Sequence, residues 1–327
     1  MSNFISHITI SNFKSLKTCE IKGCKKINLF IGRPNVGKSN ILEALSLFSI
    51  PYLQENTTKK LSSLVRLENE AELFYNGDTD KEAIILTDLA ECRLSFDAKQ
   101  GLLIKLKIFR ENIFEFVVDD LLNVKGLKYS TVELPIKKYS YKHNVIYKNA
   151  HAKYLIPPFG SNLLPIIENY KDLRRQVINF FKEYGLEIIF DKASQTLKII
   201  QKGNDGIFLI PYSSVADTLQ RIIFYKAAII SNDNSVLLFE EPEAHSFPPY
   251  MTHLTQEMIH KKDNQYFVAT HSPFILNDLL ENAREELAVF IVHYKEFETK
   301  ITKLDDAQMH DILQDGLDIF TNSESFI

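Results

Sequence analysis

The feature that most constrains this chain is an eight-residue stretch with a glycine near each end, Gly32-Arg33-Pro34-Asn35-Val36-Gly37-Lys38-Ser39. It fits G-x-x-x-x-G-K-[ST] and lies between an apolar run at 26–31 and a run with helical spacing at 40–48. The glycines let the backbone turn its N–H groups inward, and the helix that follows adds the positive end of its dipole. The lysine offers a charge to the β- and γ-phosphates, and the serine hydroxyl a ligand to Mg²⁺. The loop and the adjoining Asn40 therefore predict a site for a nucleoside triphosphate and Mg²⁺.

A pair of acidic residues follows a second apolar run. The run at 235–239 predicts a buried strand, and Glu240 and Glu241 come directly after it. In open α/β sheets, ligands bind beyond the carboxyl ends of the strands. We expect Glu240 to hold Mg²⁺ through water and Glu241 to orient or deprotonate the water that attacks the phosphate. The alternative for two adjacent glutamates is a solvated surface charge.

A histidine stands at the end of a third apolar run. The predicted strand at 265–269 is followed by Thr270, His271, Ser272 and Pro273, and the proline suits the first turn of a helix. A histidine in this position can sense the γ-phosphate with its imidazole. The alternative is a core histidine whose hydrogen bonds are satisfied within the protein.

The composition of the chain indicates where the protein is located in the cell and which classes of partner it can attract. No apolar run reaches the roughly 20 residues that a membrane span needs, and the N-terminus lacks a signal-peptide pattern. Cys19, Cys24 and Cys92 form no C-x-x-C motif, so we expect reduced thiols in a cytoplasmic protein. The net charge of -4 gives no general attraction to nucleic acid. A local stretch of lysines and tyrosines at 137–154 is a candidate nucleic-acid contact; the alternative is a solvated strand edge.

The order of the predicted elements divides the chain into three parts. Strand-like runs dominate 1–109 and predict an antiparallel N-terminal subdomain around the loop. Residues 110–205 carry no nucleotide chemistry and read as an inserted α+β arm, with a helix at 165–184 and a hairpin at 186–200. Helices alternate with strands in 206–327, which predicts a parallel sheet.

Taken together, the motifs resemble those of a known family. The loop at 32–39, the stretch 237–245 and the tetrapeptide 270–273 are similar to the Walker A, Walker B and switch-histidine motifs of ABC-type ATPases. The resemblance is strongest to the OLD, RecF and SMC-like group, whose typical opening also matches Asn12-Phe13-Lys14-Ser15. It covers residues 5–50 and 208–295 and implies an α/β P-loop NTPase of ABC-ATPase type with a mixed sheet.

The resemblance also implies partners and further site residues. In that group ATP lies between two head-to-head subunits, which implies a homodimer or higher homo-oligomer. The segment that would touch the partner's γ-phosphate contains Ser213 and Ser214, either of which could also cap the next helix. The glycines usual in this segment are absent. Arg66 is a weak candidate for the residue that couples Mg²⁺ to the arm, where the family uses a glutamine.

The resemblance implies an ATPase that works as a nucleotide-dependent sensor or switch. The chain stops about fifty residues after His271, too few for the TOPRIM nuclease domain of OLD proteins, so the effector, a nuclease or toxin, would be a separate protein in anti-phage defence. One alternative is a DNA-repair or chromosome-maintenance ATPase of RecF/SMC type. Another is a nucleotide-gated scaffold with negligible turnover.

Overall fold

The protein forms two compact units, built from interleaved parts of the chain. The computed structural model describes residues 4–97, 99–108, 112–127, 134–148, 150, 152–191, 194, 196–203, 206–317, 319–320 and 322–326. The first unit comprises 1–138, 234–241 and 263–327, and the second comprises 139–233 and 242–262.

This division differs from the expected boundaries at 109/110 and 205/206. Strand β7 (Asn112–Val118) pairs with β6 (Gly101–Ile108), which extends the first unit beyond residue 109. Helix α4 (Asp217–Ser231) and helix α5 (Pro248–His260) belong to the second unit although they lie in the predicted C-terminal part.

The first unit contains a six-stranded sheet that carries the strands of the three sequence motifs. Its strands in order are β16 (Glu298–Lys303), β15 (Leu287–Lys295), β3 (Ile27–Ile31), β14 (Gln265–Ala269), β13 (Val236–Glu240) and β9 (Ile136–Tyr139). Strand β3 is parallel to both neighbours, β14 and β15, and β14 is parallel to β13. Every residue of β3 and β14 is buried, as expected for parallel strands covered on both faces.

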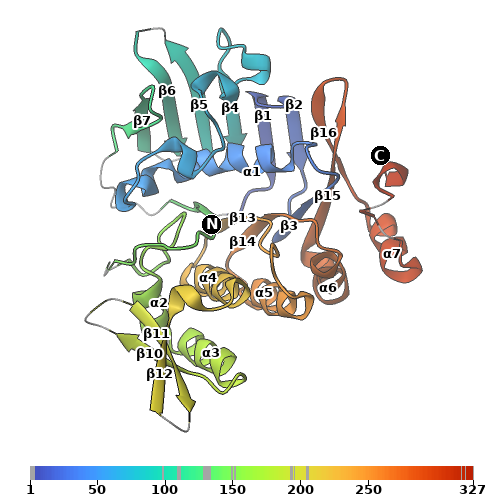
Figure 1. Ribbon diagram of the computed structural model, residues 1–327. Coiled ribbons are helices and arrows are strands. Elements are labelled where there is room, and N and C mark those ends of the chain that lie inside the picture. Colours follow the sequence, from blue (N-terminus) through green and yellow to red (C-terminus); the bar gives the residue numbers. More distant parts are fainter. Residues whose placement is uncertain are drawn as a thin grey trace. The chain divides into compact units, whose positions relative to one another are not determined.

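A seven-stranded antiparallel sheet forms the rest of this unit's framework. Its order is β2 (Leu16–Lys22), β1 (His7–Phe13), β4 (Ala83–Thr87), β5 (Ala90–Asp97), β6, β7 and β8 (Val124–Lys125). Helix α1 (Lys38–Ser46) lies between the two sheets and packs on β13 and β14 on one side and on β1 on the other (Figure 1). Helix α1 ends at Ser46, two residues before the end of the run with helical spacing, and a 3₁₀ helix (Leu47–Glu55) continues through Pro51.

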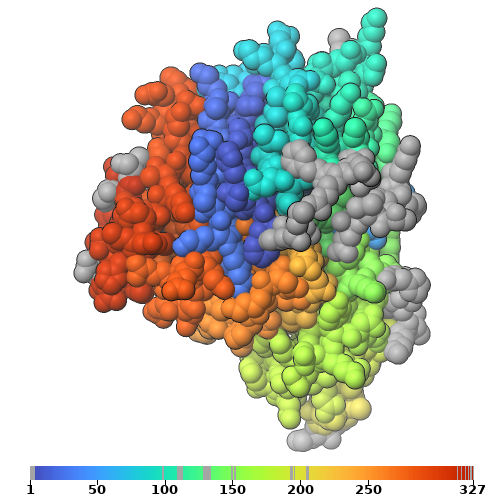
Figure 2. All heavy atoms as spheres, turned by 180° about the vertical axis from the view of Figure 1, so that it is seen from behind, coloured from blue at the N-terminus to red at the C-terminus, as the bar shows by residue number. Residues whose placement is uncertain are grey.

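Residues from the two ends of the chain join in the first unit. Strand β2 packs against β16, and Figure 2 shows the N-terminal strands in blue beside C-terminal residues in orange and red. The backbone N–H of Thr299 donates to the carbonyl of Ser15 at 2.9 Å. Two helices complete the C-terminal part, α6 (Pro273–Ala283) and α7 (Asp306–Asp315), and the Asp305 carboxylate caps α7.

Among the residues that the structure describes, the second unit combines helices α2 to α5 with a small sheet. The sheet is antiparallel, in the order β10 (Glu187–Asp191), β11 (Thr196–Gly203) and β12 (Gly206–Pro211). The predicted hairpin is confirmed, whereas β12 was not predicted. The single helix expected at 165–184 is two helices, α2 (Leu163–Asn169) and α3 (Lys171–Lys182), because the backbone of Tyr170 is extended between them.

Within the described residues, no helix is both long and apolar enough to cross a membrane. Cys19, Cys24 and Cys92 are free thiols, as expected, and burial raises the pKa of Cys19 and of Cys24 to about 12.

Candidate nucleotide-binding site

The predicted phosphate loop and the ends of the two motif strands meet around one pocket of the first unit. The pocket has a volume of about 360 Å³ and is lined by Pro34, Asn35, Gly37, Lys38, Ser39, Asn40, Arg66, Glu241, Ala269 and His271. The strand register explains the meeting, because Glu240 pairs with Ala269, which pairs in turn with Phe30 just before the loop. Three parallel strands therefore end at one edge of the sheet, where ligands bind in such folds.

The two glycines are required by the backbone of the loop. Gly37 has φ 103°, and a Cβ there would lie 2.1 Å from the Thr299 hydroxyl oxygen. Gly32 has φ 150°, and its Cβ would lie 2.2 Å from the carbonyl oxygen of Val292. The Thr299 hydroxyl also donates to the carbonyl of Val36 at 2.8 Å. The C-terminal strands thus leave room for glycine alone and hold the loop in shape.

The Lys38 ammonium lies inside the loop. Its side chain donates to the carbonyls of Gly32 at 2.8 Å and Arg33 at 2.7 Å, and the residue is 5% exposed. Burial lowers the pKa of Lys38 to about 8, although the nearby Glu241 carboxylate opposes this shift. A buried ammonium within a glycine-shaped loop is a good fit for the phosphates of a nucleotide.

Glu240 and Ser39 provide oxygen atoms beside that loop. The Ser39 hydroxyl is hydrogen-bonded to the Glu240 carboxylate. Burial opposes ionisation of Glu240, but the bond from Ser39 and the cations Lys138 and Arg66 hold its pKa below the usual value. A hydroxyl and an ionised carboxylate are ligands that Mg²⁺ accepts. These two residues would hold the ion, directly or through water.

Glu241 and His271 face each other across the pocket. Glu241 Oε1 lies 3.8 Å from His271 Nε2, a separation compatible with a contact that tightens when substrate binds. Glu241 has φ 42°, unusual for a residue with a side chain, and its N–H donates to the carbonyl of Ala269 at 2.8 Å. Burial and the Lys38 charge lower the pKa of His271, against the effect of Glu241, so the imidazole is neutral at pH 7.

A charge network behind the pocket was largely missed by the sequence interpretation. Glu43 on α1 is fully buried, and its carboxylate pairs with Lys14 and accepts from Arg66 Nε at 2.8 Å. Arg66 Nη2 also donates to Glu240 Oε1 at 2.9 Å, so one guanidinium bridges α1 and the end of β13. Arg66 was named only as a weak candidate. The signal available for Glu43 was its spacing of one helical turn after Ser39.

Lys138 completes this network. It is 6% exposed, donates to the carbonyl of Leu64 at 2.7 Å, and lies 3.7 Å from Glu240 Oε2. Burial lowers the pKa of Lys138 in spite of the carboxylates of Glu240 and Glu43. Two cations on one carboxylate fix the direction in which Glu240 points.

We expect Arg66→Ala to lower both stability and turnover. The buried Glu43 would lose one partner, and a hydrogen bond to a charged group contributes about 1.5–3 kcal/mol, so the free energy of unfolding should fall by about that amount. Glu240 would also lose its bridge to α1. A loss of about 1.4 kcal/mol of transition-state stabilisation would reduce ATP turnover by about tenfold while ATP still binds. Urea denaturation and a phosphate-release assay measure the two effects.

The control is Arg93→Ala, which removes an arginine that pairs with the carboxylates of Glu82 and Glu91 at the surface. Exposed pairs contribute about 0.2–1 kcal/mol, so this variant should behave like wild type. Equal stability of the two variants would contradict a structural role for the Arg66 bridge.

Ser213 and Ser214 belong to the second unit. They lie in a 3₁₀ turn (Tyr212–Ser214), and the expectation that one of them caps the next helix is wrong. Helix α4 begins later, with Ala216 at its N-cap, because Val215 and Ala216 have extended backbones that separate the turn from the helix. Contact of either serine with a partner's phosphate stays a prediction.

The basic and aromatic stretch at 137–154 is only partly at the surface. Lys137 and Lys138 are buried, and the fully buried Tyr139 donates its hydroxyl to the carbonyl of Leu155. The first three residues of this candidate nucleic-acid contact are therefore part of the protein core and cannot contact nucleic acid. Lys142, His143, Lys148 and Lys153 are exposed, and His151 lies outside the described residues.

Comparison with known proteins assigns the family. Residues 27–277 match the family described as "AAA domain, putative AbiEii toxin, Type IV TA system", and this range holds all three motifs. The chain belongs to this family. It is a P-loop ATPase of the ABC type, in the RecF/SMC-like group, and the expected fold class is confirmed.

Curated relatives and a solved structure agree with this assignment. An "ATP/GTP phosphatase" of Helicobacter pylori is 35% identical over 95 residues, which are 26% of this chain and 25% of that protein. The "DNA replication and repair protein RecF" of Clostridium acetobutylicum is 25% identical over 215 residues, 61% of this chain and 56% of that protein. The ATPase thus spans a quarter to just over half of the length of these relatives.

A crystal structure of an SMC head bound to the C-winged helix domain of ScpA has a TM-score of 0.52 with this chain. The alignment covers 94% of this chain and 100% of the SMC head at 14% identity, which shows a shared fold.

Proposed function

We propose that this ATPase hydrolyses ATP slowly and acts as a nucleotide-dependent switch for a separate effector protein. The observation that carries the proposal is one pocket lined by Lys38, Ser39, Glu241 and His271. Glu240 is hydrogen-bonded to Ser39 beside it. Phosphate binding, metal binding and water activation need these groups, and they lie within one unit. The family description, which names a toxin–antitoxin system, supports an effector of the nuclease or toxin type.

Each residue then has a separate role. Lys38 and the loop N–H groups would bind the phosphates, and Ser39 and Glu240 would hold Mg²⁺, which would neutralise phosphate charge. Glu241 orients the attacking water and takes its proton. The neutral His271 keeps Glu241 in place and can donate to a phosphate oxygen. Arg66 and Lys138 position Glu240.

The switch requires that ATP and ADP lead to different assemblies. A γ-phosphate held by one subunit can accept hydrogen bonds from Ser213 or Ser214 of a second copy, each contributing about 1.5–3 kcal/mol. A symmetric dimer forms every such contact twice. Binding of ScpA by the SMC head is a precedent, within this fold, for a separate partner.

Light scattering on Glu241→Gln protein tests this model. We expect the mass to shift to that of a dimer with Mg-ATP and much less with Mg-ADP, because ADP lacks the γ-phosphate. Adding Ser213→Ala and Ser214→Ala should weaken the shift without changing ATP affinity, whereas Ser194→Ala, in the same unit, should not. A mass that is the same with ATP, ADP and no nucleotide rules out the ATP-bridged dimer.

The second candidate is a DNA-repair or chromosome-maintenance ATPase. It is favoured by the RecF relatives and by the exposed Lys142, Lys148 and Lys153. Stimulation of ATP hydrolysis by DNA would support it over the effector switch.

The third candidate, a scaffold with negligible turnover, rests on Ala216 and Thr218 in the segment where the family carries glycines. Steady ATP hydrolysis would exclude this scaffold.

A further inference from the structure

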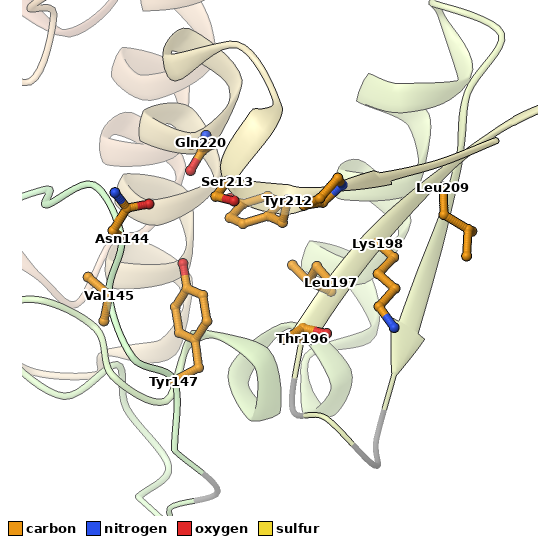
Figure 3. Close-up of a pocket in the computed structure, with 11 residues that line it drawn as sticks. Asn144, Val145, Tyr147, Thr196, Leu197, Lys198, Leu209, Tyr212, Ser213 and Gln220 are labelled. Carbon is orange, nitrogen blue, oxygen red and sulfur yellow. The ribbon is translucent and has the colours of Figure 1, made fainter.

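A second cavity lies entirely within the second unit. Its volume is about 550 Å³, within the range of pockets that bind small molecules. Figure 3 shows it between an irregular loop, the strands of the small sheet and the start of α4. It is lined by Asn144, Val145, Tyr147, Thr196, Leu197, Lys198, Leu209, Pro211, Tyr212, Ser213 and Gln220. None of the residues that line the pocket around the phosphate loop also lines this cavity.

The walls of this cavity suit a flat ring. Tyr147 on the loop and Tyr212 after β12 present their rings, and Leu197 of β11 lies beside them (Figure 3). Aromatic side chains stack on planar ligands, and stacking is tolerant of the exact ring because every such ring has a π face. Polar side chains, among them Asn144 and Ser213, line the same cavity.

The Tyr212 hydroxyl is a buried polar group without a hydrogen-bond partner among the described residues. Tyr212 is 6% exposed, and among the described residues its hydroxyl has no hydrogen-bond partner. Burial raises its pKa well above the usual value, with help from the neighbouring phenols of Tyr147 and Tyr141, so the group stays an O–H donor. A buried donor without an acceptor is costly and rare in folded proteins. The hydroxyl oxygen itself is closed off as it stands, so a ligand with a ring nitrogen or a carbonyl would satisfy it once the Tyr212 side chain turns toward that ligand. An aliphatic side chain of a partner protein would not satisfy it.

The charge of the cavity limits the ligand further. The charged residue that lines it is Lys198, and its ammonium pairs with Asp191 at 2.6 Å. The part of the ligand that enters is therefore uncharged, planar and polar at its edge. We propose that this cavity binds a nucleobase, either of a free nucleoside or of a single-stranded nucleic acid. In the second case Lys142 and Lys148, exposed on the segment that carries Tyr147, would neutralise the backbone.

The probe for a free nucleoside is 2-aminopurine riboside, whose fluorescence is quenched by stacking. It is titrated into the full chain with saturating Mg²⁺ and a non-hydrolysable ATP analogue, and again into Lys38→Ala protein. Binding in both cases shows a site separate from the ATP site, whatever the outcome for ATP hydrolysis. The probes for a single strand are a short oligothymidylate and an abasic strand of the same length.

Two variants locate the site. Tyr212→Phe removes the unpaired hydroxyl alone and should weaken binding by about 2- to 12-fold without loss of thermal stability. Tyr147→Ala removes one ring and should weaken binding by about 5- to 150-fold. The matched control is Tyr75→Phe in the first unit, whose hydroxyl donates to the carbonyl of Phe297 and which should bind like wild type.

Binding of the riboside that weakens in both variants supports a free nucleoside as the ligand. Binding of oligothymidylate alone, weakened in both variants and absent with the abasic strand, supports a base of a single strand. The proposal is overturned if no probe binds, if the abasic strand binds as tightly as oligothymidylate, or if both tyrosine variants bind like wild type.

Discussion

ATP binding should be lost when Lys38 is replaced by alanine. The side chain donates two hydrogen bonds inside the loop, and the same ammonium would bind the phosphates. Two charge-assisted bonds of about 1.5–3 kcal/mol each correspond to a loss of affinity of at least about a hundredfold. Isothermal titration of ATP measures the change, and the circular dichroism spectrum should stay that of wild type. Lys22→Ala, at an exposed lysine of β2, is the control.

Unchanged ATP affinity in Lys38→Ala protein would refute the loop as the nucleotide site.

The pH dependence of ATP affinity in the wild-type protein is a second test of the role of Lys38. Because burial lowers the pKa of Lys38 to about 8, the free protein loses this charge as the pH rises through that value. Affinity for ATP should therefore be constant below pH 8 and fall by up to about tenfold for each pH unit above it.

Turnover, in contrast to binding, should depend on Glu241. Glu241→Gln keeps the size and hydrogen bonding of the side chain but removes the base, so ATP hydrolysis should fall by ~10²-fold or more while ATP affinity is retained. Phosphate release under saturating ATP and isothermal titration measure the two quantities. The control, Glu68→Gln, changes an exposed glutamate of the same unit. Hydrolysis at the wild-type rate in Glu241→Gln would move the catalytic role to Glu240 or elsewhere.

The strands and the pocket of the ATP site could be predicted because their signals are local. Strands β3, β13 and β14 are short apolar runs, and the motif residues follow them directly in the sequence. Once the strands are parallel neighbours, their carboxyl ends must meet. The position of Glu240, Glu241 and His271 at one sheet edge could therefore be predicted without knowledge of contacts between distant parts of the sequence.

Features that depend on distant partners could not be predicted in this way. The buried Lys138 is stabilised by the carbonyl of Leu64 and by Glu240, and no local pattern separates it from an exposed lysine such as Lys142. The periodic apolar pattern at 165–184 continues across Tyr170, and the break depends on tertiary contacts there, among them a hydrogen bond from the Tyr170 hydroxyl to the carbonyl of Lys153.

The place of β3 in its sheet has a consequence for how the protein is made. The strand that leads into the phosphate loop leaves the ribosome early, but its neighbours β14 and β15 follow only after most of the chain has been synthesised. Until then the five residues of Ile27–Ile31, all buried in the finished protein, lack the neighbouring strands they pair with. The nascent chain can therefore form wrong strand pairs. The loop also lacks Thr299 and the carbonyl of Val292, which shape its backbone in the finished protein. We therefore expect the loop to reach the shape that can bind a nucleotide only after Thr299 of β16 has been made.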